Sequence, residues 1–382
     1  SSNGLEKRPK LRFPDFDEPW KVFKAEELFQ NITDKNHPDE TVLTIIQGKG
    51  TLPREQAGRN IHYDDASLSN YKKVEQGDFI IHLRSFEGGL EMANEAGIVS
   101  PAYTILRCKR PHSSLFYDAY FHTDEFINHN LSKSVEGIRD GRQISYEAFK
   151  WLGIPYCEPT EQEKISNLFA ALNERIAKQR DLVESLKKYK RGVTEAIFTK
   201  DLRFTTKGVP YPQWDKKYVG DICKIQTGKS NTQDETSQGS YPFYVRSPSI
   251  RKSNRYLFDC EAVLTVGDGV GTGKVFHYVT GKFDLHQRVY AMTDFKIVSG
   301  KYFYYYFSHF FYDRVMRMTA KTSVDSVRYE MIDKMTIQIP CHEEQQQIVS
   351  FLDCLEHSVI EAEKTLNLLE KLKSGCLQQL FI

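Results

Sequence analysis

The residues of this sequence best suited to chemistry lie in short loops that combine glycine with arginine, lysine, glutamine, serine or asparagine. Two such loops lie in the first half, at residues 84–89 (RSFEGG) and 137–145 (GIRDGRQIS). The second half has five, at residues 226–231 (QTGKSN), 246–255 (RSPSIRKSNR), 267–274 (GDGVGTGK), 286–288 (HQR) and 321–328 (KTSVDSVR). Glycine lets a backbone approach a ligand closely, whereas arginine, lysine and glutamine bind phosphates and base edges. One such loop is ordinary for a protein surface, but the recurrence in both halves indicates contact with nucleic acid.

The motifs of bond-making catalysis are incomplete. Residues 267–274 resemble a phosphate-binding loop, but Asp268 replaces its first glycine and Val275 replaces the serine or threonine that follows Lys274. A dinucleotide-binding loop would need a third glycine where Lys274 stands. Residues 342–346 (HEEQQ) lack the second histidine of a zinc-protease helix. The sequence therefore predicts a protein that recognises its partner without a catalytic site or a bound metal.

Composition limits the class of protein. The 382 residues carry a net charge of +1, so any binding of nucleic acid must come from local basic patches. None of the seven cysteines forms a CxxC pair, which argues against a disulfide framework or structural zinc and fits a cytoplasmic location. The first residues have no apolar signal core, and no run of about 18 apolar residues occurs, so we expect no membrane association.

Short β-type runs must position the loops. The first half has three, at residues 41–46, 78–83 and 102–108, and the second half has three, at residues 260–266, 274–279 and 287–292. An aromatic segment near the end of each half, at residues 115–121 and 302–307, predicts a buried helix. The expected fold class is α+β, with largely β cores.

A long helix with a narrow apolar seam is predicted in the middle of the chain. Its seam positions alternate between four and three residues apart, the heptad spacing of a coiled coil. They are Ile165, Phe169, Leu172, Ile176, Gln179, Val183, Leu186 and Lys190. Moving each by 183 residues gives a second seam of Ile348, Leu352, Leu355, Val359, Ala362, Leu366, Leu369 and Lys373. Thr160, with Glu163 three residues later, predicts an N-cap for the first helix.

The repeat at this spacing indicates a tandem duplication. Other matched positions include Gln162 with Gln345 and Phe198 with Phe381. We expect a first domain at residues 1–157, a first helix at 158–199, a second domain at 200–340 and a second helix at 341–382. The simplest partner for the first seam is the second seam, as an antiparallel coiled coil. The alternative is that each helix packs on its own domain or on another protein.

The doubled unit resembles the specificity subunits of Type I restriction–modification enzymes. The resemblance is carried by residues 154–204 and 339–382, each a proline-containing start followed by Glu-Gln and the long helix. Residues 12–21, 141–155 and 271–290 are also similar, so the likeness covers essentially the whole chain. The first copy departs slightly from the family's helix-start pattern, because Glu163 and Lys164 stand between Gln162 and Ile165.

The resemblance implies a non-catalytic subunit that recognises a bipartite, asymmetric duplex DNA site. Each domain would read one part of the site, and the paired helices would act as a spacer between them. Two modification subunits, which bind S-adenosylmethionine, would join the chain, and restriction subunits, which use ATP and Mg²⁺, would complete the complex. No cofactor is expected in this chain itself.

Individual DNA contacts do not follow from the resemblance, so the candidates rest on loop position and chemistry. They are Arg84, Arg139 and Arg142 in the first half, and Lys229, Arg246, Lys274, Gln287, Arg288 and Arg328 in the second. The alternative function is a coiled-coil scaffold with two protein-binding domains. A third possibility, an enzyme with its own active site, is disfavoured by the incomplete motifs.

Overall fold

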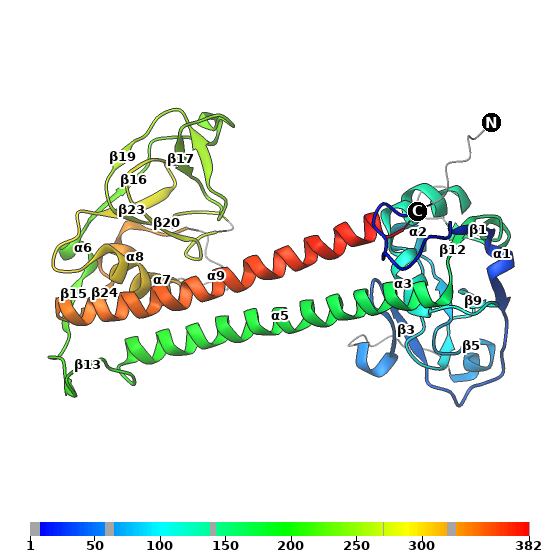
Figure 1. Cartoon of the computed structure of the whole chain (residues 1–382). Coiled ribbons are helices and arrows are strands. Elements are labelled where there is room, and N and C mark those ends of the chain that lie inside the picture. Colours follow the sequence, from blue (N-terminus) through cyan, green and yellow to red (C-terminus); the bar gives the residue numbers. More distant parts are fainter. Residues whose placement is uncertain (1–7, 58–64, 138–142, 270, 319–325, 382) are drawn as a thin grey trace. The chain divides into compact units, whose positions relative to one another are not determined.

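The computed structural model describes residues 8–57, 65–137, 143–269, 271–318 and 326–381. The chain divides into two compact units. The first comprises Ser1–Arg180 and Lys364–Ile382, and the second comprises Asp181–Glu363. Two long helices, α5 (Pro159–Thr199) and α9 (His342–Gln379), each contribute residues to both units (Figure 1).

The first unit is built on an antiparallel sheet with the order β2-β9-β6-β7. Its strands are β2 (Phe29–Ile32), β9 (Thr104–Cys108), β6 (Phe79–Ile81) and β7 (Glu91–Met92). The smaller pairs are β1 (Lys21–Lys24) with β12 (Gly153–Tyr156), β3 (Leu43–Ile46) with β4 (Gly50–Pro53), β5 (Lys72–Val74) with β8 (Gly97–Val99), and β10 (Val135–Glu136) with β11 (Gln143–Ile144). The short helices are α1 (Ala25–Leu28), α2 (Ser85–Gly88), α3 (Ser114–Phe121), α4 (Tyr146–Phe149), η1 (Arg54–Ala57), η2 (Asp65–Asn70), η3 (Glu125–Asn130) and η4 (Leu131–Ser134).

The second unit repeats this plan and adds a second sheet. Its first sheet, in the order β16-β23-β20-β21, contains β16 (Lys224–Thr227), β23 (Val289–Thr293), β20 (Ala262–Val266) and β21 (Phe276–Val279). Its other strands are β18 (Arg251–Ser253), β17 (Tyr241–Tyr244), β22 (Lys282–Leu285) and β19 (Phe258–Asp259) in one sheet, with the pairs β15 (Asp215–Tyr218) and β24 (Thr336–Ile339), and β13 (Thr205–Thr206) and β14 (Val209–Pro210). The helices are α6 (Val219–Ile222), η6 (Thr232–Asp234), α7 (Gly300–Met318) and α8 (Tyr329–Asp333).

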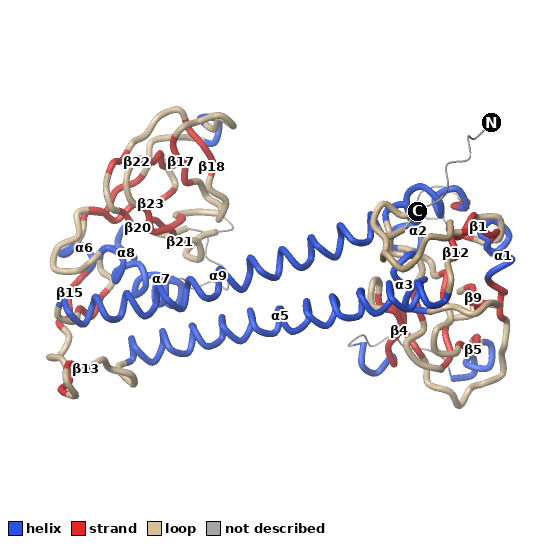
Figure 2. The backbone as a smooth tube through the Cα atoms, in the orientation of Figure 1, coloured by secondary structure: helices blue, strands red, loops and turns tan. Residues whose placement is uncertain are grey.

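The strand runs and aromatic helices expected from the sequence are confirmed. All six runs contain a strand, namely β3, β6, β9, β20, β21 and β23 (Figure 2). The aromatic segments form α3 and α7, and their rings fill the two domain cores because apolar side chains dominate one face of each helix. Among the described residues, no helix has both the length and the apolar character needed to cross a bilayer.

Each long helix begins at a buried carboxylate in its first turn. In α5, the Arg12 guanidinium donates to both oxygens of Glu161, at 2.7 and 2.9 Å, and the Trp20 indole N–H donates at 3.1 Å. In α9, Arg203 and Trp214 bind Glu344 in the same way, at 2.8, 3.0 and 2.8 Å. Both carboxylates are almost wholly buried, at 1% and 0% exposure. A helix N-terminus favours negative charge, and the guanidinium fork supplies the countercharge.

A buried glutamine follows each of these glutamates. The Gln162 amide accepts from the Ser113 backbone N–H at 3.0 Å and donates to the Cys157 carbonyl at 2.8 Å. Gln345 likewise accepts from the Ser299 N–H at 2.9 Å and donates to the Pro340 carbonyl at 3.0 Å. The matched Gln162 and Gln345 in the sequence therefore join each helix start to the aromatic helix of its own domain.

The N-cap prediction for the first helix is wrong. The helix already includes Pro159 and Thr160, and the backbone N–H groups of Glu161 and Gln162 donate to the Glu158 carbonyl. Proline is favoured at the first helical position because its missing N–H has no intrahelical partner there.

The two seams pair in antiparallel fashion within each unit. In the first unit, Phe169 stacks on Phe381 with ring centroids 6.1 Å apart, and Arg180 binds Glu370 at 2.8 Å. In the second unit, Lys187 binds Glu363 at 2.9 Å, and Lys190 binds Glu356. In both units the residue number on α9 falls as that on α5 rises.

Burial follows the predicted seams closely. Every seam residue is buried or half-buried, whereas the off-seam residues Leu182 and Leu368 are 47% and 66% exposed. The antiparallel coiled coil expected from the heptads is therefore confirmed.

The end of each long helix packs in the core of the domain that the helix does not follow directly in sequence. The end of α9 thus enters the first core, and the end of α5 enters the second. Phe381, just after α9, packs against Phe116 of the first domain at 5.2 Å between ring centroids. Phe198, near the end of α5, packs against Tyr306 of the second domain at 5.1 Å. These matched phenylalanines occupy equivalent places in the two cores.

We predict that Glu344→Ala lowers the free energy of unfolding by about 3–5 kcal/mol, because it leaves the mostly buried Arg203 guanidinium without its carboxylate. Urea denaturation of the chain measures this change. The matched control is Glu343→Ala, an exposed glutamate in the same turn, which should be nearly neutral. Equal, small effects of the two substitutions would contradict the role assigned to Glu344.

Candidate nucleic-acid interface

The candidate interface of the second domain is an edge where the ends of five strands meet. The Lys229 and Ser230 N–H groups, after β16, donate to the Leu285 carbonyl at the end of β22. The His286 N–H donates to the Tyr244 carbonyl at the end of β17, at 3.0 Å. The Gly267 N–H, after β20, donates to the Arg288 carbonyl at 2.8 Å, just before β23. These backbone bonds join the loops into one surface.

The sequence-predicted candidates of the second half lie on this edge. The side chains of Lys229, Arg246, Lys274, Gln287, Arg288 and Arg328 are all exposed. Lys274 lies over the Tyr312 ring of α7, with its ammonium 5.0 Å from the ring centroid. Arg328 joins the edge because the neighbouring Val327 N–H donates to the Gly267 carbonyl at 2.7 Å. Loops that are far apart in sequence thus bring six candidates to one region.

One carboxylate lies between two of these arginines. Asp268 is 3.3 Å from the Arg246 guanidinium through Oδ1 and 3.6 Å from that of Arg288 through Oδ2. The arginine side chains remain 48% and 63% exposed, so these ion pairs contribute little to stability. Asp268 instead holds both guanidinium groups close together, where each keeps donors free for an anion or a base edge.

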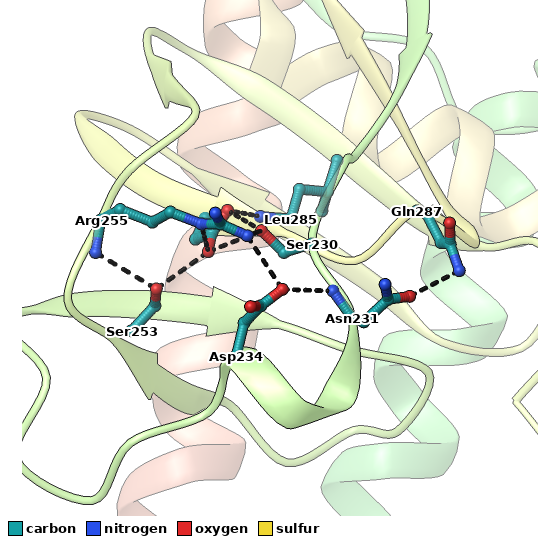
Figure 3. A network of polar contacts seen from close by, with 8 residues as sticks. Ser230, Asn231, Asp234, Ser253, Arg255, Leu285 and Gln287 are labelled. Carbon is teal, nitrogen blue, oxygen red and sulfur yellow. Dashed lines mark hydrogen bonds and ion pairs between the residues drawn. The ribbon is translucent and has the colours of Figure 1, made fainter.

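The sequence reasoning missed the buried network beneath this edge. Asp284, in β22, is fully buried, and it accepts hydrogen bonds from the hydroxyls of Ser230 and Ser253, the two serines labelled in Figure 3. The Arg255 guanidinium lies 3.6 Å from the Asp284 carboxylate and forms an ion pair with Asp234 at 2.9 Å. Arg255 stands in a loop that the sequence singled out, but its partners come from three other segments. The one available signal was a charged residue within the strand-like run at residues 282–285.

Of the three DNA-contact candidates predicted in the first domain, only Arg84 lies within the residues that the structure describes. Arg84 follows β6 at the start of α2, and its exposed guanidinium binds Glu87 at 2.6 Å. Arg139 and Arg142 lie outside the described residues, so their prediction stays untested. Among the described residues of both units, no group of three or more histidine, cysteine or acidic side chains gathers to hold a metal ion.

A buried carboxylate also fixes a loop of the first domain. Glu91, in β7, is fully buried and accepts from the backbone N–H groups of Gly48 and Gly50, at 2.6 and 2.8 Å. These glycines form the turn between β3 and β4, and the turn leaves Lys49 exposed between them. Gly50 has a φ of +77°, and an added Cβ would lie 2.5 Å from the Met92 carbonyl oxygen, so a larger residue would not fit.

His122 completes the anchor of this turn, with its imidazole 3.4 Å from Glu91. Burial alone would raise the pKa of Glu91, but the bonds from His122 and Gly48 lower it below its usual 4.5. Burial alone would lower the pKa of His122, but the bond to Glu91 and the charge of Asp118 raise it above 6.5. In mildly acidic solution Glu91 is therefore ionised and His122 is protonated, so the two groups form an ion pair.

We predict that His122→Gln lowers the free energy of unfolding by about 1.5–3 kcal/mol near pH 6, because it removes a hydrogen bond between charged groups. A histidine with a raised pKa contributes stability below its unfolded pKa and loses it as pH rises through the folded value. The loss of unfolding free energy caused by His122→Gln should therefore become smaller toward pH 9, as measured by urea denaturation. His129→Gln, at an exposed histidine of the same unit, should show little cost at either pH. A constant cost for His122→Gln across this range would contradict the charged pair.

Comparisons with known proteins agree with this architecture. The family model described as the Type I restriction modification DNA specificity domain matches residues 211–373. The Type I restriction enzyme EcoDI specificity subunit of Escherichia coli is 28% identical over 142 residues, which cover 37% of this chain and 31% of that protein. The MjaVIII specificity subunit of Methanocaldococcus jannaschii is 25% identical over 187 residues, covering 46% of this chain and 43% of that one. The aligned region is thus less than half the length of each of these two relatives.

A solved structure shares the fold over nearly the whole chain. The crystal structure of the Type I restriction–modification S subunit from M. genitalium covers 98% of this chain and 99% of its own, with a TM-score of 0.64 and 13% identity. The shared fold and the family-model match in the second half together confirm the resemblance to Type I specificity subunits that the doubled sequence unit indicates. The chain thus resembles Type I restriction–modification specificity subunits, in sequence over residues 211–373 and in fold over 98% of its length.

Proposed function

We propose that this chain is the non-catalytic subunit that recognises a bipartite, asymmetric duplex DNA site for a Type I restriction–modification complex. Each domain reads one part of the site with loops at strand ends, and the paired helices set the distance between the two parts. The observation that carries the proposal is the second-domain edge, where six exposed, mostly cationic side chains stand on loops joined by backbone hydrogen bonds.

The chemistry of this edge suits duplex DNA. Arg246 and Arg288 each offer a planar set of donors that fits phosphate oxygens or the O6 and N7 atoms of guanine. Lys229 and Lys274 are point charges suited to phosphates. A chain with a net charge of +1 gains its affinity from such a local patch, and the partner subunits add further contacts.

Partners complete the activity in this proposal. Two modification subunits bind S-adenosylmethionine and transfer the methyl group, and restriction subunits bind ATP and Mg²⁺. The chain itself holds no cofactor and recruits these subunits to the site. Its relatives are named specificity subunits, which supports recognition as the role of this chain.

Arg288→Ala tests the second-domain edge. If Arg288 reads a base, specific binding by the complex reconstituted with its modification subunits falls by roughly 1–3 kcal/mol, and preference relaxes at one position of one half-site. Sequencing of methylated sites in a randomised duplex library measures both changes. Lys216→Ala, at an exposed cation on β15, is the matched control and should leave the site unchanged. An unaltered site in Arg288→Ala would remove this residue from the interface.

The spacer role is tested by lengthening the coil without breaking its phase. Seven residues inserted after Val183 and seven after Leu366 add one heptad to both seams, or roughly 10 Å of helix. We expect the gap between the two recognised parts to change, as read from the methylated sites. The same insertion in α5 alone shifts one helix against the other and should abolish specific binding. An unchanged gap after the paired insertion would contradict the spacer role.

A further inference from the structure

The buried Asp284 carboxylate connects three segments that carry or flank the second-domain edge. Its Oδ1 accepts from the Ser230 hydroxyl at 2.7 Å, and its Oδ2 accepts from the Ser253 hydroxyl at 2.9 Å (Figure 3). Arg255 donates to the Ser230 oxygen at 3.0 Å, so the hydroxyl is held from both sides. A fully buried carboxylate with these partners is costly to leave unpaired, which makes the arrangement of the loops well defined.

The turn that carries Gln287 is fixed by the backbone as well. The Gln287 N–H donates to the Ser230 carbonyl at 2.9 Å, and the Val289 N–H donates to the His286 carbonyl at 2.9 Å. The Ser230 N–H in turn donates to the Leu285 carbonyl at 3.1 Å. Ser230 therefore binds the turn through its backbone and Asp284 through its side chain.

The Gln287 side chain is exposed, and a hydrogen bond from its amide holds it against the neighbouring loop. Its Nε2 donates to Oδ1 of Asn231 at 2.5 Å, and the Asn231 N–H is itself held by the Asp234 carboxylate at 2.7 Å. This bond uses one of the two Nε2 hydrogens. The amide keeps a second N–H donor and the adjacent acceptor Oε1. Among the described residues, neither of these two groups has a hydrogen-bond partner.

One donor beside one acceptor is the pattern that matches adenine in the major groove. Adenine offers N7 as an acceptor and N6 as a donor, whereas guanine offers two acceptors and would require a second donor in place of Oε1. Holding the amide in advance also lowers the ordering cost that a long exposed side chain meets on binding.

We propose that Gln287 recognises an adenine in the part of the DNA site bound by the second domain, and that Asp284 is the residue that positions it. The inference rests on the proposed function, because it assigns one base of the site to one side chain. Asp284 touches no DNA in this arrangement. It acts through Ser230, which fixes both the loop of Asn231 and the turn of Gln287.

Gln287→Glu is the direct test, because it replaces the amide nitrogen, and with it both donors, by an acceptor oxygen. Preference for adenine at one position of the site should fall roughly 5- to 150-fold, and cytosine, which offers its N4 donor, should be favoured there instead. The complex reconstituted with its modification subunits is given a randomised duplex library, and the methylated sites are sequenced. Gln233→Glu adds the same charge at an exposed glutamine of the neighbouring η6 and should leave every position unchanged.

The outcomes separate this inference from the proposed function. A wild-type complex that methylates no defined bipartite site would overturn the function itself. A wild-type complex with a defined site, combined with a Gln287→Glu complex whose preferences are unaltered, would overturn only the assignment of Gln287. Equal weakening at all positions would identify Gln287 as a phosphate-side contact and would also overturn the adenine assignment.

Asp284→Asn tests positioning, because it removes the charge that holds Arg255 while keeping the shape of the side chain. Preference should relax at the position that Gln287 reads, with the other half-site unaffected. Ser230→Ala is the second variant if Asp284→Asn does not fold, since it removes only the hydroxyl link. Full adenine preference in a folded Ser230→Ala or Asp284→Asn complex would overturn the positioning role.

Discussion

The structure depends on a carboxylate buried in the first turn of each long helix. Glu161 and Glu344 lie where the helix dipole favours negative charge, and each is bound by an arginine and a tryptophan from the segment that enters its domain. Because a buried carboxylate tolerates few arrangements of its partners, the entering segment, the domain and the helix are fixed to one another. A rigid joint of this kind is what a domain on a long arm requires if its loops are to meet a partner in a defined orientation.

Buried carboxylates recur at the loops that the domains present. Glu91 fixes a glycine turn in the first domain through backbone N–H groups, and Asp284 in the second binds Ser230 of the loop after β16 and Ser253 at the end of β18. In both cases the polar anchor lies in a strand and the exposed side chains lie beyond it. A loop secured from beneath can vary at its tip without losing its position, which suits a surface whose exposed residues decide what is recognised.

The sequence predicts the two long helices better than the second-domain edge. A heptad seam depends only on residues three and four apart, so Ile165 and its matches on the second helix could be identified without a structure. Loop composition singles out Arg288 as a candidate, and the structure places it exposed on the second-domain edge, but its contact with DNA stays a prediction. The role of Asp284 could not be identified in this way, because its partners Ser253 and Ser230 lie 31 and 54 residues away and only the folded sheet brings them together. The N-cap prediction at Thr160 failed for a different, local reason, because the adjacent Pro159 already occupies the first helical position.

The two phenylalanines at the helix ends have a consequence for synthesis. The core of the first domain contains Phe381, so that core cannot be completed when residue 180 has been made. Roughly 200 further residues must be added first, which takes on the order of 10–40 s at common translation rates. During that interval an apolar site bordered by Trp20 and Phe116 remains open. The first domain thus stays an open acceptor for a segment made roughly 200 residues later, and its core closes only when that segment packs against it.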